Sequence, residues 1–268
     1  MEELRMVSPS DTALQTLIPP RDRLAFVRIE RMLERGRPLV LTDGQSCLLV
    51  LGEPKTPAWI WTANDISEEM LHSLFDSLAT LRSTGQLSGI IAKGTVARLA
   101  ELAWSSIPAE RQRMSVYRMD RLRVCTAEGE FVPGSEVVSV RAGELLDRLS
   151  FADGNPMTAA QRREAGEAFG KDAFAAGWRA PDGTVASIAR RADVGSGYSV
   201  IHSVVTDAPY RNRGYAKALL SVLCERILQE NRIPMLYADR DYAPSNAAYR
   251  GVGFEERAHL CASRWKEP

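Results

Sequence analysis

The chain has 268 residues, of which 45% are hydrophobic and 25% are charged, so its composition is that of a folded globular protein and excludes a largely disordered one. The 34 basic and 34 acidic side chains give a formal net charge of zero, which argues against a general nucleic-acid binder and against a polybasic membrane patch. At about 100–200 residues per domain, this length predicts one large domain or two small ones.

The four cysteines lie far apart and form no CxxC pair, so they predict neither a zinc clip nor a disulfide framework. The three histidines show no ligand spacing, and we expect no metal site. The acidic N-terminus lacks the apolar segment of a signal peptide, and no apolar run approaches the ~20 residues of a membrane helix. We therefore expect a soluble, cytoplasmic protein that binds neither membranes nor nucleic acids.

The first 125 residues alternate between helical and strand-like patterns, which is typical of an α/β layer. A helical pattern broken by Pro19-Pro20 covers residues 12–35. Two apolar runs, 39–41 and 48–51, flank Asp43-Gly44, a dipeptide typical of a β-hairpin turn. The other strands expected in this half lie near 59–61, 88–92 and 114–124. A cap-rich stretch, 64–69, is expected to open a helix through Met70 to Leu78, and a second helix is expected over 96–104.

Residues 126–135 are rich in turn formers, and we place a domain boundary there, dividing the chain into residues 1–130 and 131–268. The second unit is expected to begin with residues 137–140. Its predicted helices are 143–150, 158–170, 214–230 and one from 245, and its predicted strands are 173–179, 184–191, 198–206, 235–238 and 259–265.

Two glycine-containing segments resemble nucleotide-binding loops only superficially. The run from Gly166 to Asp172 lacks the glycine spacing of a phosphate loop and the hydroxyl that would hold magnesium, so we interpret it as a helical surface. The run Gly195-Ser196-Gly197 precedes a strand, whereas a dinucleotide fingerprint must follow one, so we interpret it as a hairpin turn.

The segment after residue 198 carries the strongest pattern. An apolar strand ends in a polar loop that contains Pro209 and then enters a helix near Gly214. The free amides and positive dipole end of a first helical turn form an anion site. Arg211 and Arg213 add positive charge beside it, and Gly214 and Ala216 keep the backbone accessible.

The run Arg211-Asn212-Arg213-Gly214-Tyr215-Ala216 resembles the acyl-coenzyme A loop of the GNAT superfamily of N-acetyltransferases, whose signature is Gln/Arg-x-x-Gly-x-Gly/Ala. The downstream run from Asn246 to Phe254 is similar to the family pattern Asn-x-x-x-Tyr-x-x-x-Gly-Phe, with one residue fewer between Asn246 and Tyr249. The two runs lie in the family's order, with an apolar strand between them.

The resemblance extends to a bacterial subgroup in which a degenerate GNAT-like domain precedes the acetyltransferase domain, and residues 60–67 are similar to a segment of its first half. No coenzyme A signature occurs in residues 1–130. We therefore expect this half to bind no cofactor and residues 136–268 to hold the cofactor on their own.

The resemblance implies a mixed α+β fold, with a central mixed, splayed β-sheet preceded by the smaller GNAT-like α/β domain. The resemblance implies acetyl-CoA as the co-substrate, bound between strands 198–206 and 235–239, and it implies no metal ion. The cofactor-binding residues that the resemblance implies are Val204, Val205 and Thr206 for the pantetheine arm, Arg211, Asn212, Arg213, Gly214, Tyr215 and Ala216 for the pyrophosphate, and Asn246 and Tyr249 near the pantetheine and the sulfur.

Tyr249 matches the family tyrosine that protonates the departing thiolate. The catalytic base is open: His202 is the only side chain of strand 198–206 that titrates near neutrality, and Asp239 and Asp241 are alternatives. Gly251 stands where the family often has a basic residue, so a phosphate contact there is in doubt unless Arg250 replaces it.

The leading hypothesis is acetyl transfer from acetyl-CoA to the primary amine of a small molecule or peptide, directly, in a ternary complex. A non-catalytic acyl-CoA sensor is the alternative from another class, and transfer of a longer acyl chain is a third. The zero net charge identifies neither the acceptor nor the oligomeric state.

Overall fold

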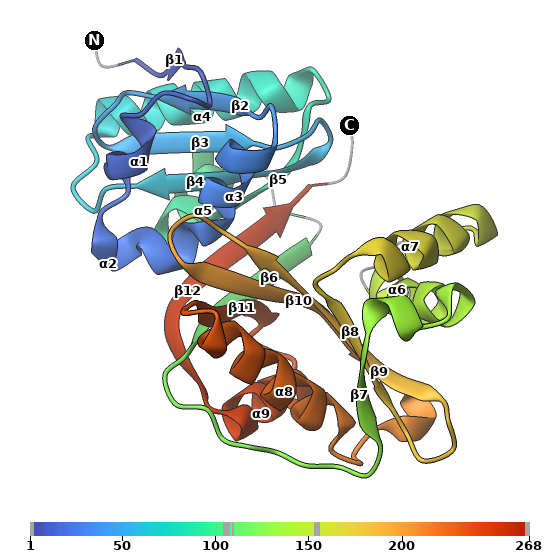
Figure 1. Cartoon of the computed structure of the whole chain (residues 1–268). Helices are drawn as coiled ribbons and strands as arrows, with labels where there is room; N and C mark the ends of the chain where they lie inside the picture. The colour runs from blue at the N-terminus through green and yellow to red at the C-terminus, as the bar shows by residue number, and fades with distance from the viewer. Residues whose placement is uncertain (1–2, 104–107, 109, 153–155, 266–268) are drawn as a thin grey trace.

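The computed structural model describes residues 3–103, 108, 110–152 and 156–265 (Figure 1). The described strands form one twelve-stranded sheet, in the order β1-β2-β3-β4-β5-β12-β6-β11-β10-β9-β8-β7. The strands are β1 Arg5–Met6, β2 Leu39–Thr42, β3 Cys47–Leu51, β4 Thr56–Thr62, β5 Leu87–Ala92, β6 Glu110–Met119, β7 Glu130–Pro133, β8 Ala175–Arg179, β9 Val185–Asp193, β10 Tyr198–Thr206, β11 Ile233–Asp239 and β12 Phe254–Arg264. The α-helices are α1 Leu14–Leu17, α2 Pro20–Arg23, α3 Val27–Arg35, α4 Glu68–Ser83, α5 Gly94–Ala103, α6 Ser139–Ala152, α7 Ala159–Lys171, α8 Tyr215–Gln229 and α9 Ala243–Val252.

Local sequence signals explain several element boundaries. The β2–β3 hairpin turns at Gly44, whose φ of +84° suits glycine, while the Asp43 carboxylate accepts backbone N–H groups from Gln45 to Cys47. Helix α4 begins after Ser67, whose hydroxyl accepts the Met70 N–H at 3.1 Å. The predicted hairpin and helix are thereby confirmed, and the helix expected over 96–104 is found as α5, although Trp104 lies outside the described residues.

Helices cover both faces of the sheet. Helices α4 and α5 pack on one face of the N-terminal strands, and the α1–α3 region packs on the other face. The α1–α3 cluster continues past its own half and reaches Val200 of β10 and Met235 of β11. Helix α8 packs on the opposite face of those strands through Leu219 and Leu223, while α6 and α7 cover β8 and β9.

The two halves exchange their last strands. Strand β6, from the first half, lies between β11 and β12 and is antiparallel to both. Its pairs with β11 run from Met235↔Arg118 to Asp239↔Met114. Its pairs with β12 run from Phe254↔Met119 to Arg264↔Glu110. Strand β12, from the end of the chain, in turn pairs with β5, and Figure 1 shows it reaching into the N-terminal half. A second half without β6 would leave the inner edges of β11 and β12 unpaired. The second half therefore depends on a strand of the first half for its sheet, while cofactor binding by residues 136–268 alone stays a prediction.

The segment that connects β6 to β7 is pinned along α8 and α9. The Arg123 N–H donates to the Val252 carbonyl at 2.8 Å, and the Cys125 N–H donates to the Ser221 hydroxyl at 3.1 Å. Strand β7, which the sequence analysis did not predict, forms inside the turn-rich segment. Residues 137–140 lead into α6, which begins at Ser139, and Val138 and Val140 are 69% exposed there.

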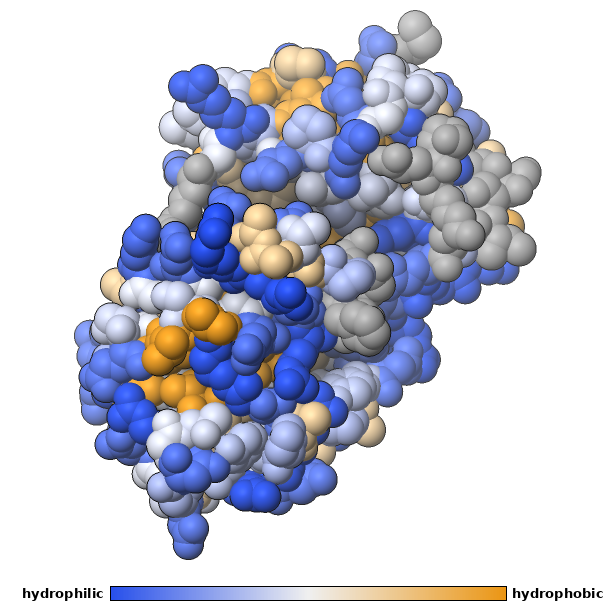
Figure 2. Space-filling view, turned by 90° about the vertical axis from the view of Figure 1, so that its right-hand side faces the viewer, coloured by the Kyte–Doolittle hydropathy of each residue, from blue (hydrophilic) through white to orange (hydrophobic). Residues whose placement is uncertain are grey.

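No helix among the described residues is long and apolar enough to span a membrane. Figure 2 shows the face that lies on the right of Figure 1, where α6 and α7 are found; hydrophilic residues dominate it, with a limited apolar patch in its lower half.

The strand exchange predicts that residues 131–268 expressed alone will be insoluble or aggregated, because β11 and β12 expose unpaired backbone edges. Co-expression with residues 1–130 should restore a soluble complex, since β6 then pairs between them. Size-exclusion chromatography and amide hydrogen exchange at β11 would measure this. A monomeric, folded 131–268 fragment with protected β11 amides would contradict the assigned role of β6.

Candidate active site

Strands β10 and β11 run parallel for only part of their length. They pair from Tyr198↔Ile233 to Ile201↔Leu236, and no pairing between them follows in the described residues. From His202 onward β10 is hydrogen-bonded on its other side alone, with Val205 opposite Ile188 of β9. The predicted splay is therefore present, and it leaves one backbone edge of residues 204–206 available for an added extended chain.

A β-bulge lies at the point where the strands part. The β9–β10 register shifts between His202 and Val205, and Ser203 has a φ of +55°, a left-handed conformation that is uncommon for a residue other than glycine. The bulge changes which side chains share a face: Val204 packs toward α8, whereas Val205 packs with α6 and α7. A bulge of this kind turns a strand amide away from the ladder.

The loop after β10 presents a bare helix N-terminus. Helix α8 begins after Gly214, which has a φ of +84° and provides no side-chain cap, and Asn212 is also left-handed at +63°. The first amides of α8 therefore have no side-chain acceptor at the N-cap. A Cβ on Gly214 would meet Ala127 Cβ and Thr126 O only at an ordinary 3.8 Å, so glycine is required here for its conformation and not for lack of space.

Two of the predicted loop residues already have partners. The Arg211 Nε donates to the Thr206 carbonyl at 3.3 Å, which ties the loop to the end of β10. The Arg213 guanidinium lies 5.6 Å from the centre of the Tyr210 ring, and the Tyr210 hydroxyl donates to Asp182 at 2.6 Å. Both arginines are exposed at the loop, and Tyr215 points inward with 5% exposure.

Asp207 anchors the start of this loop, and the sequence analysis missed it. Its buried carboxylate pairs with Arg141 at 2.5 Å and with Arg148 at 2.8 Å, both from α6. Burial acts to raise the pKa of Asp207, but the hydrogen bond from Arg141 and the two positive charges outweigh it, so the pKa is lowered. No local pattern marks this aspartate, because its partners lie about 60 residues earlier.

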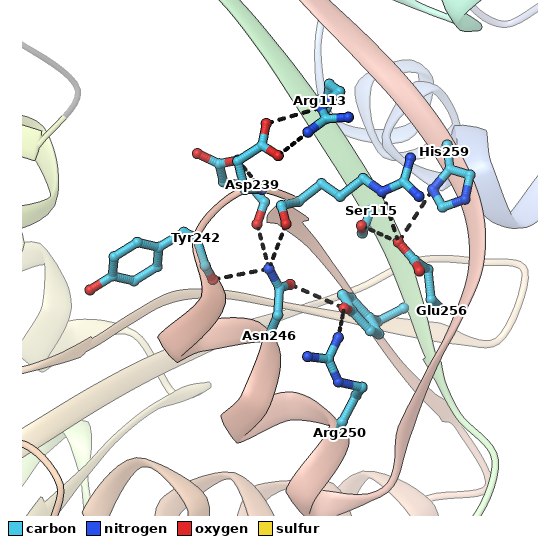
Figure 3. A network of polar contacts seen from close by, with 11 residues as sticks. Arg113, Ser115, Asp239, Tyr242, Asn246, Arg250, Glu256 and His259 are labelled. Carbon is cyan, nitrogen blue, oxygen red and sulfur yellow. Dashed lines mark hydrogen bonds and ion pairs between the residues drawn. The ribbon is translucent and has the colours of Figure 1, made fainter.

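Asn246 is held inside the protein. Figure 3 shows its side chain at the centre of a polar network at the start of α9. The Asn246 Nδ2 lies 2.8, 3.1 and 2.9 Å from the carbonyls of Asp239, Arg240 and Tyr242, and its Oδ1 accepts from the Tyr117 hydroxyl at 3.1 Å. With 3% exposure, this side chain fixes the turn between β11 and α9. A contact from it to pantetheine would require one of these bonds to be exchanged.

Tyr117 belongs to β6 and so to the first half of the chain. Its hydroxyl also accepts a hydrogen bond from Arg250 Nη1 at 3.2 Å, so the side chain considered for a phosphate contact points to Tyr117 instead. The ring of Tyr117 lies 6.0 Å from the ring of Tyr249. Sequence analysis missed Tyr117 because only the strand exchange brings it to this site.

Tyr249 is 8% exposed and packs between Tyr117 and Phe254, whose ring centre is 6.2 Å away. Burial, aided by the neighbouring Tyr117 and Tyr242, raises the pKa of Tyr249 to about 12. The phenol therefore keeps its proton at every physiological pH. No hydrogen bond within the described part of the chain engages its hydroxyl, which leaves that proton available.

Two of the candidate bases, His202 and Asp241, have depressed pKa values. Burial, together with the charges of Arg31, Arg190 and Arg28, lowers the pKa of His202 to about 4. The His202 ring is therefore neutral at pH 7, but it is a weak base. Asp241 forms a two-contact ion pair with Arg113, and the hydrogen bond from Arg113 lowers the pKa of Asp241.

Among the described residues, no group of three or more His, Cys, Asp or Glu side chains is placed to hold a metal ion. The site consists of the splayed strand edge, the bare start of α8 and the buried Tyr249.

The network around Asn246 predicts a large structural effect of Asn246→Ala. The substitution leaves the Asp239 and Arg240 carbonyls and the Tyr117 hydroxyl short of a partner at a partly buried site, so the free energy of unfolding should fall by about 2–4 kcal/mol. Urea unfolding followed by fluorescence would measure it. The matched control is Asn64→Ala, which removes one exposed contact with Lys93 and should cost less than about 1 kcal/mol. Equal losses in the two variants would contradict the anchoring role.

Part of the chain matches a known protein family. Residues 156–254 match the acetyltransferase (GNAT) family model, a span that contains the bulge, the α8 loop and Tyr249. No curated protein matches the chain.

Solved structures resemble almost the whole chain. A GCN5-related N-acetyltransferase from Sphaerobacter thermophilus is 15% identical with a TM-score of 0.67, covering 97% of this chain and 95% of its own. A Drosophila protein is 12% identical with a TM-score of 0.68, covering 100% and 99%. A tandem GNAT protein from the clavulanic acid biosynthesis pathway is 13% identical with a TM-score of 0.59, covering 98% of each chain. At these identities the likeness shows the fold, and together with the family match it supports the predicted GNAT architecture: residues 156–254 form an acetyltransferase (GNAT) family domain within a chain whose overall fold is that of the GNAT structures.

Proposed function

We propose that this protein is an N-acetyltransferase that moves an acetyl group from acetyl-CoA to a primary amine of a small molecule or peptide. The observation that carries the proposal is that Tyr249, buried and with a raised pKa, shares one packed cluster with Ile201 of β10 and Leu236 of β11, the last pair before these strands part. We infer that residues 131–268 supply the cofactor contacts and that the first half completes the site through Tyr117.

The residues present fit acetyl-CoA. The unpaired edge of Val204, Val205 and Thr206 suits the amide groups of a pantetheine arm, which bind like an added strand. The bare start of α8, from Asn212 to Ala216, suits a pyrophosphate, with Arg211 and Arg213 exposed beside it.

The bound thioester supplies an activated acetyl group. The bulge at Ser203 offers a strand amide that can polarise a carbonyl oxygen. The amine nitrogen bonds to the acetyl carbon, the carbon–sulfur bond breaks, and Tyr249 gives its proton to the departing thiolate before regaining one from solvent. Because the pKa values of His202 and Asp241 are depressed, neither holds the amine proton well, and we infer that this proton passes to water.

The sensor alternative accounts for the same cofactor contacts but not for Tyr249. A protein that only binds acyl-CoA needs no protonated phenol without an internal hydrogen-bond partner. The volume of the acyl pocket would determine whether acetyl or longer chains are transferred. Measured turnover of acetyl-, butyryl- and octanoyl-CoA would reveal this preference.

The loop assignment predicts that Gly214→Val weakens coenzyme A binding at least about tenfold, because a β-branched residue is strained at this φ and shifts the first amides of α8. Calorimetric titration with coenzyme A would measure it. The matched control is Gly197→Val, which has a φ of +87° and open space in the β9–β10 turn, and should retain binding. Unchanged affinity in a folded Gly214→Val protein would overturn the loop assignment.

The acid assignment predicts that Tyr249→Phe lowers kcat by about 10²–10⁴-fold with little change in the cofactor constant, because the ring remains and the proton is lost. The raised pKa of Tyr249 also predicts no alkaline loss of wild-type kcat from its ionisation up to about pH 10. Steady-state kinetics over an amine panel would test both, with Tyr198→Phe as the control. Nearly full turnover of Tyr249→Phe would remove Tyr249 from the mechanism.

A further inference from the structure

A cluster of arginines surrounds the first residue of the splayed segment. His202 follows directly after the last β10–β11 pair, and its partner on β9 is Arg190. After burial, the largest electrostatic influences on His202 come from Arg31, Arg190 and Arg28, and Asp172 acts in the opposite direction. Arg31 and Arg28 belong to α3, so positive charge from both halves of the chain acts on this side of β10.

The cluster lies on the side of the sheet away from the α8 loop. Val200, two residues before His202, packs with the α1–α3 cluster, while Ile201 packs with α8. Arg190 stacks 4.9 Å from the centre of the Phe169 ring of α7. The arginines thus come from the N-terminal half and from the GNAT domain and meet where an acceptor could approach the strand bulge.

Arg190 has unused donors. Its side chain is 20% exposed, and its Nε and Nη2 atoms are buried without a hydrogen bond to any described residue. Asp172 is its nearest carboxylate, with Oδ2 3.7 Å from Nε, while Oδ1 of Asp172 accepts the Phe174 N–H at 2.9 Å. Arg190 is therefore a partly exposed guanidinium, positioned over an aromatic ring, whose charge is not fully paired within the described residues.

We propose that the acceptor of this enzyme is an amine that also carries a carboxylate, and that Arg190 binds this carboxylate while Arg28 and Arg31 attract it. This inference rests on the proposed function, since it names the class of acceptor for that transfer. Binding of the carboxylate at the exposed part of the Arg190 side chain would leave the amine end directed to the bulge. Glu30, also on α3, acts on Tyr237 and is not among the groups that shift the pKa of His202.

The kinetic test compares acceptors of one length that differ in charge. With acetyl-CoA as donor, kcat/KM for 4-aminobutyrate should be at least about tenfold higher than kcat/KM for 4-amino-1-butanol. The difference between 4-aminobutyrate and 1,4-diaminobutane should be larger still. Arg190→Gln should raise KM for 4-aminobutyrate about 10–100-fold, and Arg190→Lys should keep part of the preference. The matched control is Arg226→Gln. Arg226 lies on α8, and its guanidinium is 4.0 Å from the centre of the Phe131 ring. Equal or better use of the alcohol or the diamine would overturn the proposal.

A second readout needs no turnover. In the protein without acetyl-CoA, 4-acetamidobutyrate should raise the pKa of His202, followed by NMR, because a negative charge beside the arginines favours the imidazolium. In Arg190→Gln the ligand should have no such effect. If no amine is acetylated but this shift occurs, the proposed function fails and the carboxylate site stands. If amines are acetylated without charge preference and the shift is absent, the carboxylate site fails and the proposed function stands.

Discussion

The pairing of β6 with β11 and β12 is the constraint on which the site depends. This strand from the first half lies inside the sheet of the second half and carries Tyr117 to the start of α9. The Tyr117 hydroxyl meets Asn246, which in turn holds three carbonyls of the β11–α9 turn. The orientation of α9, and therefore of Tyr249, follows from this turn. The first half is thus part of the site even though it lacks a cofactor loop of its own.

Elements with local signals were well predicted from sequence. Strand β10 has the predicted bounds 198–206, and α8 begins at Tyr215, because the apolar alternation and the helical periodicity there are continuous. The glycine run at 195–197 forms the predicted hairpin turn, with the Gly197 N–H donating to the Val194 carbonyl. Strand β7 was missed, since its four residues lie among turn formers. The strand exchange could not be predicted, because pairing between distant segments leaves no mark on local periodicity.

In the candidate site too, features with a local sequence signal were predicted and features that depend on distant segments were not. The bare start of α8 follows from Arg211, Gly214 and their spacing, since helix-terminus chemistry is local. The environment of Asn246 and the two arginines on Asp207 are non-local, and a single sequence does not display them. The splay itself has two parts: the register of the parallel pair ends at Ile201, and Ser203 then takes the left-handed conformation. A bulge at an ordinary serine carries no residue signal, whereas a glycine there would have suggested one.

The arginines beside His202 connect its weak basicity with acceptor choice. A field that favours the neutral imidazole also favours the neutral form of any amine placed next to it, since both groups gain a positive charge on protonation. An acceptor amine would therefore lose its proton more readily there than in water, and a strong side-chain base is not required. The same positive charges repel a dicationic amine and attract one whose far end is anionic. Burial favours the neutral amine, and the convergence of α3 from the first half and β9 from the second on the parted end of β10 supplies the charge selection.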